Sequence, residues 1–468
     1  MKDSVREKQI FEEYGILRAV LTLAIPTVIS QVILVIYNMA DTFFIGLTKE
    51  DAMLTSVTVC MPAFMFLSAI SNLFGVGGAS VIARALGAES EKKAKSAACF
   101  AFWGCVGLSL LYSVGAYIFM DAFVDALGGA HGLVHDNARL YLTYTVVAGG
   151  VPTALNALLS HLVRSEGRSM HAGVGIVLGG VLNIALDPLF MFVLLPRGSE
   201  VLGAALATML SNVISMVYFL AVVYLHRKES VLDLRPTRRC LDYGIPKDVL
   251  LTGLPACLMT LFENISYAVL DNLMGAFGMM AQAGIGVAKK VNMLAHNMVR
   301  GMAQGVLPLI AYNFAARNYK RMTASVRLSI GISIALAAAW MAASLIYARN
   351  LIGIFIQHES PSLDYGIDFL KILCIGGPFS AFAYGIISFF QATGESLKSF
   401  LLAILRKGLL DIPLMFILLK PFPVYGIVWA TPIADIACCI VAIVLFTAFM
   451  RRLLTRPTLS LHAAGGAR

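Results

Sequence analysis

A long apolar segment occurs twice in this chain, and the two copies are about 225 residues apart. The first copy, at 23–46, reads LAIPTVISQVILVIYNMADTFFIG, and the second, at 253–275, reads GLPACLMTLFENISYAVLDNLMG. Their prolines and their final glycines align at a common offset of 229. Further along, GAALAT at 203–208 aligns with GIVWAT at 426–431. A duplication of this kind restricts the fold to two similar bundles within one chain.

The composition is that of a membrane protein. The mean hydropathy is +0.80, 59% of the residues are apolar and only 13% are charged, against about 25% charged in soluble domains. Because the bilayer core offers no hydrogen-bond partners, apolar segments of about 20 residues are expected to be helical. We predict an all-α integral membrane protein of 12 transmembrane helices, arranged as two parallel six-helix repeats. The predicted spans are roughly 17–46, 53–83, 96–119, 138–160, 169–195, 201–225, 248–277, 280–312, 324–347, 366–391, 398–419 and 424–450.

Lysine and arginine are distributed unevenly between the two sides of the predicted bundles. With the N-terminus inside, the inward loops and tails hold 25 of these residues and the outward loops hold 5. This bias satisfies the positive-inside rule and predicts that both termini are cytoplasmic. The net charge of +9 therefore reflects topology, and nucleic acid is not an expected partner. No cleavable signal peptide is evident, because the first apolar segment is too long.

The longest basic loop separates the two repeats. We predict an N-lobe at 1–225, a cytoplasmic linker at 226–246, a C-lobe at 247–455 and a C-terminal tail at 456–468. A monomer is the expected state of such a self-contained duplicated bundle.

The chain lacks the sequence patterns of nucleotide, metal and catalytic sites. There is no GxxxxGK[ST] motif and no long soluble region for an ATPase. The eight cysteines, Cys99 among them, show no metal-ligand spacing and are interpreted as packing residues. We expect no enzyme activity, no metal and no cofactor. Any work that the protein performs must then draw on an ion gradient or on a partner.

Two acidic residues, Asp41 and Asp187, lie inside predicted spans of the first half. From the helical rise, Asp41 is about 7–8 Å and Asp187 about 12 Å below the outer end of its span. Thr208 is about 10 Å below the outer end of the sixth span. These three residues therefore share one depth, at which the first half has no lysine or arginine. Two buried carboxylates oppose each other's ionisation, which suits the binding of a proton or a small hard cation such as Na⁺.

Further polar residues accompany each acid. Asn183 is one helical turn from Asp187 on the same face, and Tyr37 and Asn38 stand similarly to Asp41. We predict that Tyr37 and Asn38 line the cavity and contact the substrate. Acids inside a membrane usually face a cavity or a partner. The alternative interpretation is a structural polar cluster that pins the six helices together.

These segments resemble the multidrug and toxic compound extrusion (MATE) family, in its DinF-like bacterial branch. The resemblance extends over about 17–449 and rests on AIPTVISQVILVIYNMADTFFIG, GASVIARALGAES, NIALDPLF, GAALAT and FFQATGESLKS. It implies a V-shaped pair of lobes in the bacterial inner membrane and a drug/cation antiporter. In the N-lobe it implies a cation site made of four residues: Asp41, Asn183, Asp187 and Thr208.

The second half has acids of its own, together with bases inside the predicted spans. Glu263 and Asp411 lie near mid-membrane, and Asp271 is one residue out of register with Asp41. No acid occupies the position matched to Asp187. The bases are Lys289, Lys290, Arg300, Lys371, Arg406 and Lys407. Ion pairs between these acids and bases are one interpretation, and contacts of Glu263 and Asp271 with a cationic substrate are the other.

The sequence therefore predicts a multidrug efflux antiporter that exports organic, cationic amphiphiles in exchange for H⁺ or Na⁺. Ion binding at Asp41 and Asp187 would neutralise the N-lobe cavity and favour bending of the first helix at a hinge near Pro26. The expected partners are small-molecule drugs and the lipid bilayer. The alternatives are a lipid-linked saccharide flippase of the same superfamily, which the acidic N-lobe disfavours, and a non-transporting membrane protein such as a receptor.

Overall fold

The computed structural model describes residues 9–48, 50–128, 132–242, 244–356 and 360–455. These residues form helices and short connections, and none of them lies in a β-strand. The predicted C-terminal tail, 456–468, lies outside the described residues. The all-α class predicted from the sequence is confirmed.

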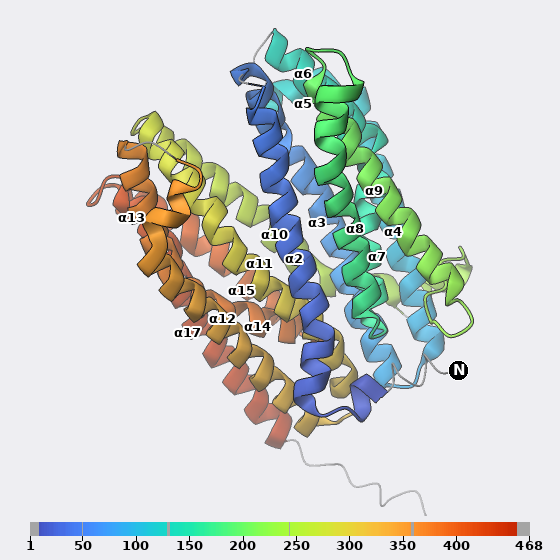
Figure 1. Ribbon diagram of the computed structural model, residues 1–468. Helices are drawn as coiled ribbons and strands as arrows, with labels where there is room; N and C mark the ends of the chain where they lie inside the picture. The colour runs from blue at the N-terminus through green and yellow to red at the C-terminus, as the bar shows by residue number, and fades with distance from the viewer. Residues whose placement is uncertain (1–8, 49, 129–131, 243, 357–359, 456–468) are drawn as a thin grey trace, which may run out of the picture.

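The N-lobe runs from α2 to α9 (Figure 1). Its α-helices are α2 (Ile16–Gly46), α3 (Asp51–Gly87), α4 (Glu91–Ile118), α5 (Met120–Ala126), α6 (Leu133–Leu142), α7 (Gly150–Ser165), α8 (Ser169–Pro188) and α9 (Glu200–Leu225). Two π-helical segments, η1 (Thr143–Ala148) and η2 (Leu189–Leu194), continue α6 and α8. The helices on either side of Gly149 meet at a bend of 51° and form one broken span.

The C-lobe repeats this plan from α10 to α17. Its α-helices are α10 (Ile245–Gly275), α11 (Met279–Ala315), α12 (Tyr319–Gly353), α13 (Pro361–Ile375), α14 (Gly377–Thr393), α15 (Ser396–Ile404), α16 (Ile412–Leu419) and α17 (Tyr425–Thr455). A π-helical segment, η4 (Leu405–Asp411), joins α15 to α16. The helices α13 and α14 meet at a bend of 44° and form the second broken span.

Eight helices of the described chain are long and apolar enough to cross a membrane, and the two bent pairs raise this number to ten. The two remaining predicted spans are α11 and the continuous stretch α15–η4–α16. Both are less apolar because they carry basic residues, among them Arg300 in α11 and Lys407 in η4. The twelve predicted spans thus all correspond to helical segments of the two lobes.

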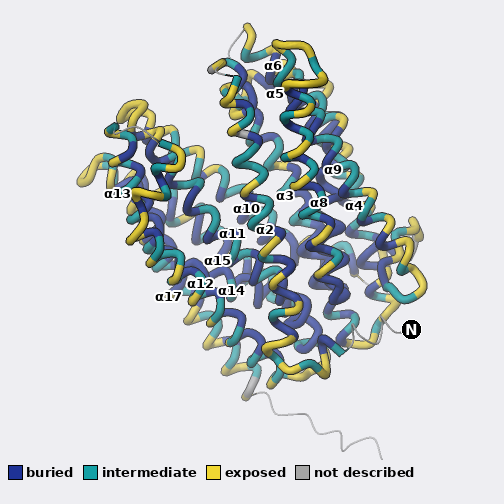
Figure 2. The backbone as a smooth tube through the Cα atoms, viewed as in Figure 1, coloured by how far each residue is buried: buried dark blue, intermediate teal, exposed yellow. Residues whose placement is uncertain are grey.

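The two lobes meet at the end where α2 begins and separate toward the opposite end (Figure 1). Where they meet, Asn72 of α3 donates to Thr260 of α10 at 2.9 Å, and Gln31 of α2 donates to Gln304 of α11 at 3.3 Å. Figure 2 shows this region as largely buried. Contacts of α2 with α11 thus lie in the first half of α2, and Asp41 lies in its second half.

At this end, glycines of α11 allow its backbone to approach the backbone of α2 closely. A Cβ atom on Gly301 of α11 would lie 2.8 Å from the Cα atom of Val28, and one on Gly305 would lie 2.8 Å from the Cα atom of Ala24. Both partners belong to α2. Small residues are therefore required along this face of α11 for the lobes to close.

The linker between the lobes folds back on α4. Cys240 of the linker forms a disulfide with Cys99, and the indole of Trp103 donates to the carbonyl of Leu234 at 2.8 Å. The interpretation of Cys99 as a packing residue is therefore wrong. The two cysteines are 141 residues apart, and only the path of the linker brings them together.

Candidate functional site

The two N-lobe acids come from neighbouring helices that pack closely. Asp41 lies in α2 and Asp187 in the last turn of α8, and both are buried, with 8% and 0% of their surface exposed. The glycine Gly180 of α8 allows the approach, because a Cβ atom there would lie 2.8 Å from Cγ2 of Ile33. The two carboxylates are near enough to act electrostatically on each other.

Asn183 connects α8 to α9. Its amide nitrogen lies 3.4 Å from Oδ1 of Asp187 and 3.4 Å from Oγ1 of Thr208, as donor to both. Asn183 and Thr208 are themselves buried. The sequence analysis placed these residues at one depth from helical rise alone, and the structure brings three of them into contact and Asp41 beside them.

Three oxygens of this cluster have no hydrogen-bond partner although they are buried: Oδ1 of Asp41, Oδ2 of Asp187 and Oδ1 of Asn183. Among the described residues, no lysine, arginine or histidine forms an ion pair with either acid. A buried polar atom without a partner is unfavourable and calls for an explanation. Oxygen ligands from carboxylates, an amide and a hydroxyl are those that a proton or a small hard cation requires. We call these four residues, Asp41, Asn183, Asp187 and Thr208, the acidic site.

Two further predicted residues, Tyr37 and Asn38, flank the acidic site on α2. The hydroxyl of Tyr37 is within electrostatic range of both acids. The amide of Asn38 donates to the carbonyl of Leu34 in its own helix at 2.7 Å. Asn38 therefore bonds to its own helix, and Tyr37 lies near enough to both acids to feel their charge.

A chain of polar residues beyond the acidic site was missed by the sequence analysis. The amide of Asn212 donates to the carbonyl of Thr208 at 2.9 Å, and the amide of Asn156 donates to Oδ1 of Asn212 at 2.9 Å. The hydroxyl of Ser215 donates to Oδ1 of Asn156 at 2.7 Å. Asn212 is one turn from Thr208, a spacing that could have indicated its role. The chain fixes α9 against α7 and so holds Thr208 in place.

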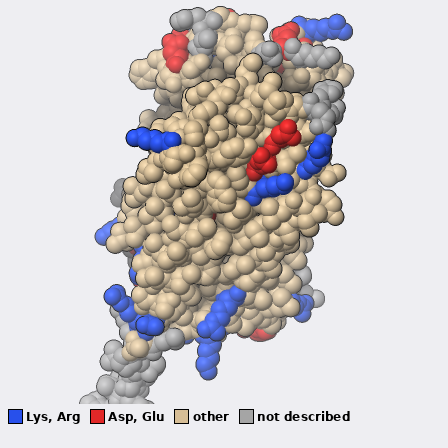
Figure 3. Space-filling view, turned by 90° about the vertical axis from the view of Figure 1, so that its left-hand side faces the viewer, with Lys and Arg blue, Asp and Glu red and all other residues tan. Residues whose placement is uncertain are grey.

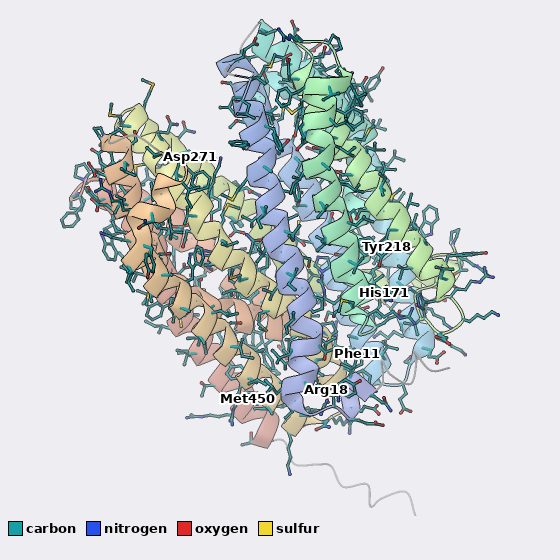
Figure 4. All side chains as sticks on the ribbon, viewed as in Figure 1. Phe11, Arg18, His171, Tyr218, Asp271 and Met450 are labelled. Atoms are coloured by element: carbon teal, nitrogen blue, oxygen red, sulfur yellow. A yellow bond between two sulfur atoms is a disulfide. The ribbon has the colours of Figure 1, made fainter. Side chains whose placement is uncertain are left out.

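The C-lobe acids, in contrast, are paired with bases. Glu263 forms an ion pair with Arg300 and accepts a hydrogen bond from Tyr384 at 3.3 Å. Asp271, which lies near the free end of the C-lobe (Figure 4), forms an ion pair with Lys289. The ion pairs that the sequence offered as one interpretation are therefore present.

Asp411 lies one residue before the position matched to Asp187 and is also buried. It lies 2.8 Å from Nζ of Lys407 and accepts a hydrogen bond from Thr431 at 2.9 Å. Thr431 aligns with Thr208 when the two repeats are compared. The position matched to Asp187 is Ile412, so the acid nearest to it, Asp411, is one residue out of register. A π-helical segment follows Asp187 in the N-lobe, and another ends at Asp411 in the C-lobe.

A second buried ion pair in the C-lobe was not foreseen. Nε of Arg406 lies 2.6 Å from Oδ1 of Asp435, and both side chains are almost completely buried. Asp435 is one turn after Thr431 in α17, so its position inside an apolar span was readable from the sequence. The pairing itself joins two helices, and no sequence spacing indicates it.

The predicted hinge residue, Pro26, lies within α2, which continues as a single helix from Ile16 to Gly46. The carbonyl oxygen of Pro26 would be 2.9 Å from a Cβ atom on Gly173 of α8. This helix therefore passes Pro26 without a break and is in close contact with α8 at that point.

Two repeated helical bundles with an unpaired acidic centre inside one of them define a class of membrane transporter built from internal repeats. The model of the MatE family matches residues 26–189 in the N-lobe and 255–417 in the C-lobe, and the chain belongs to this family. The family assignment made from the sequence is confirmed, whereas the bacterial branch within it stays a prediction.

Similar proteins extend over nearly the whole chain. Multidrug export protein MepA of Staphylococcus saprophyticus is 28% identical over 450 residues, which cover 95% of this chain and 96% of that protein. MepA of Staphylococcus aureus is 27% identical over 447 residues, with the same coverage. A solved structure of a multidrug resistance MATE family transporter in the outward-facing conformation matches with a TM-score of 0.86 and 26% identity. That match covers 95% of this chain and 98% of the other.

Proposed function

We propose that this protein is a multidrug efflux antiporter that exports organic, cationic amphiphiles in exchange for H⁺ or Na⁺. The single observation that carries the coupling scheme is the acidic site, where two buried carboxylates act electrostatically on each other and neither has a basic partner among the described residues. The family match and the multidrug export proteins among its relatives support the direction and the substrate class. No cofactor is needed besides the coupling ion.

The coupling of ion entry to drug export follows from the charge of Asp41 and Asp187. When Asp41 and Asp187 are both ionised, the N-lobe attracts a cation, and the binding of H⁺ or Na⁺ removes that attraction. A cationic drug is then released, provided that ion and drug differ in affinity between the two conformations of the transporter. Bending of α2 near Pro26 is the proposed movement of this step. In the C-lobe, Asp271 would contact the substrate through Oδ2, which its ion pair with Lys289 does not use. Glu263 would do so through Oε1, which also accepts a hydrogen bond from Tyr384.

The proposed setting is the inner membrane of a bacterium, with a monomeric transporter and both termini in the cytoplasm. The excess of lysine and arginine on one side supports this orientation. The lobes then meet on the cytoplasmic side and separate toward the outside.

The test is drug efflux from proteoliposomes, with a pH gradient and a Na⁺ gradient imposed separately. We expect one of the two gradients to drive transport by the wild type and Asp41→Asn to lose most of it. Asp242→Asn, at an exposed acid in the linker, is the matched control and should transport normally. Full gradient-driven transport by Asp41→Asn would remove Asp41 from the coupling scheme, and no transport by the wild type under either gradient would refute the proposed function.

A further inference from the structure

A groove lies on the C-lobe between the beginning of α12 and the end of α17. Its volume is about 910 Å³. Both helices pack against α14, and Phe389 of α14 lies edge-on to Phe446 of α17, with ring centroids 5.1 Å apart. The groove therefore runs between α12 and α17 and has α14 behind it. In Figure 1, α17 lies on the side of the C-lobe that faces away from the N-lobe, whereas α12 also contacts α2.

The groove combines an apolar part with three cations. Leu328, Phe446 and Met450 supply partly buried apolar surface. Figure 4 shows Met450 near the end of the C-lobe from which the chain continues into its tail. The cations are Lys320, Arg327 and Arg451, all of them exposed. In Figure 3 this face of the molecule is largely uncharged in its middle, and basic side chains gather toward its lower end.

Within the described part of the chain, no acid pairs with these cations. None of the ten lining residues is acidic, and among the described residues none of the three cations forms an ion pair. Each of them therefore has its charge available to a ligand. The surface is complementary to an anion and not to a cationic drug.

The depth of the three cations in the membrane indicates which class of anion they bind. Arg327 is about 12 Å along α12 from its first residue, and Arg451 is about 6 Å from the end of α17. Both helices cross the membrane in this fold, so Arg327 reaches the level where headgroups meet acyl chains. A charged side chain at such a depth is unfavourable unless an opposite charge accompanies it. A phosphate of a membrane lipid is at the right level, and guanidinium groups bind phosphate through paired hydrogen bonds.

We propose that this groove is a binding site for an anionic phospholipid in the leaflet at the end of the lobes where they meet. The headgroup phosphate contacts Lys320, Arg327 and Arg451, and an acyl chain follows Leu328, Phe446 and Met450. Basic pockets between transmembrane helices are a recurrent form of such sites. This site is distinct from the acidic site, and its occupant carries the opposite charge.

The binding experiment is native mass spectrometry of the full-length protein released from nanodiscs that contain phosphatidylglycerol and phosphatidylcholine in equal amounts. We expect the wild type to retain phosphatidylglycerol in preference. The triple variant Lys320→Gln/Arg327→Gln/Arg451→Gln should lower the retained ratio of the two lipids by at least about tenfold, because each cation near the headgroups contributes to anion binding. The matched control is Lys92→Gln/Lys228→Gln/Lys247→Gln, which removes the same charge from exposed positions outside the groove and should retain the preference.

A thermal unfolding series separates a lost site from a damaged protein. In phosphatidylcholine alone, the triple variant and the wild type should unfold at the same temperature, and added phosphatidylglycerol should stabilise only the wild type and the control. The proposal is overturned if the wild type shows no lipid preference or if the triple variant keeps it. It is also overturned if millimolar glycerol phosphate displaces phosphatidylglycerol equally well from the wild type and from the triple variant. The lipid would then be bound at a place other than the groove. The readout is binding, so these outcomes do not depend on whether the protein transports drugs.

Discussion

Nζ of Lys407 lies 2.8 Å from Oδ2 of Asp411 in the C-lobe, and Nδ2 of Asn183 lies 3.4 Å from Oδ1 of Asp187 in the N-lobe. In each lobe the two residues are four positions apart in the sequence. Lys407 lies 224 positions after Asn183, and Asp411 lies 224 positions after Asp187. The duplicated bundle therefore keeps the buried acid and changes its neighbour. Lysine neutralises the acid in one lobe, and asparagine leaves it charged or protonatable in the other.

Removal of Lys407 should destabilise the C-lobe strongly. Lys407→Met leaves Asp411 buried without its cation, and we expect a loss of about 3–5 kcal/mol in the free energy of unfolding. The double variant Lys407→Met/Asp411→Leu should recover most of this loss, because an apolar pair replaces an ion pair at little cost. The measurement is thermal unfolding in detergent, with Lys420→Met at an exposed position as control. A single variant as stable as the wild type would show that Asp411 finds another partner.

The substitution Asn183→Lys should transfer the C-lobe arrangement to the N-lobe. A lysine there can reach Asp187, one turn away, and pair with it as Lys407 pairs with Asp411. We expect the variant to fold but to lose gradient-driven drug efflux by at least about tenfold, since the cation would replace the coupling ion. Proteoliposome transport together with thermal unfolding measures both effects. Asn350→Lys, which adds the same charge at an exposed end of α12, should transport normally. Wild-type efflux by Asn183→Lys would argue that Asp187 does not bind the ion.

A larger residue at Gly253 should weaken the closed end of the molecule. A Cβ atom at Gly253 of α10 meets the backbone of Leu73 in α3. Gly253→Leu therefore overpacks the contact between the lobes, with an expected cost of about 1–3 kcal/mol to this conformation. Hydrogen exchange should rise in the facing parts of α3 and α10. Gly331→Leu is the matched control, because nothing lies within 4 Å of a Cβ atom there. Unchanged exchange in Gly253→Leu would mean that the lobes tolerate the extra volume.

The residues of the acidic site were predictable because acidic residues are rare inside apolar spans. A carboxylate inside an apolar span is costly, so Asp41 and Asp187 are visible in the sequence without any knowledge of their neighbours. Their common depth follows from helical rise, and Asn183 follows from the spacing of one turn. The roles of these residues in ion coupling stay predictions.

The partners of the C-lobe acids were harder to predict. Arg406 and Asp435 lie on different helices, and so do Glu263 and Arg300. A membrane helix that is apolar on all sides does not reveal which face it turns toward its neighbours. The sequence therefore left open whether these acids are paired or available to a substrate.

The sequence by itself determined the apolar spans, their duplication and the presence of acids within them, because the bilayer leaves an apolar segment no structure other than a helix. Only the tertiary structure decided which charges are neutralised, which cysteines are joined and where basic residues surround a groove. Those features depend on how each helix is rotated and on how the linker returns to α4. Contacts between many helices set both, and no single segment encodes them.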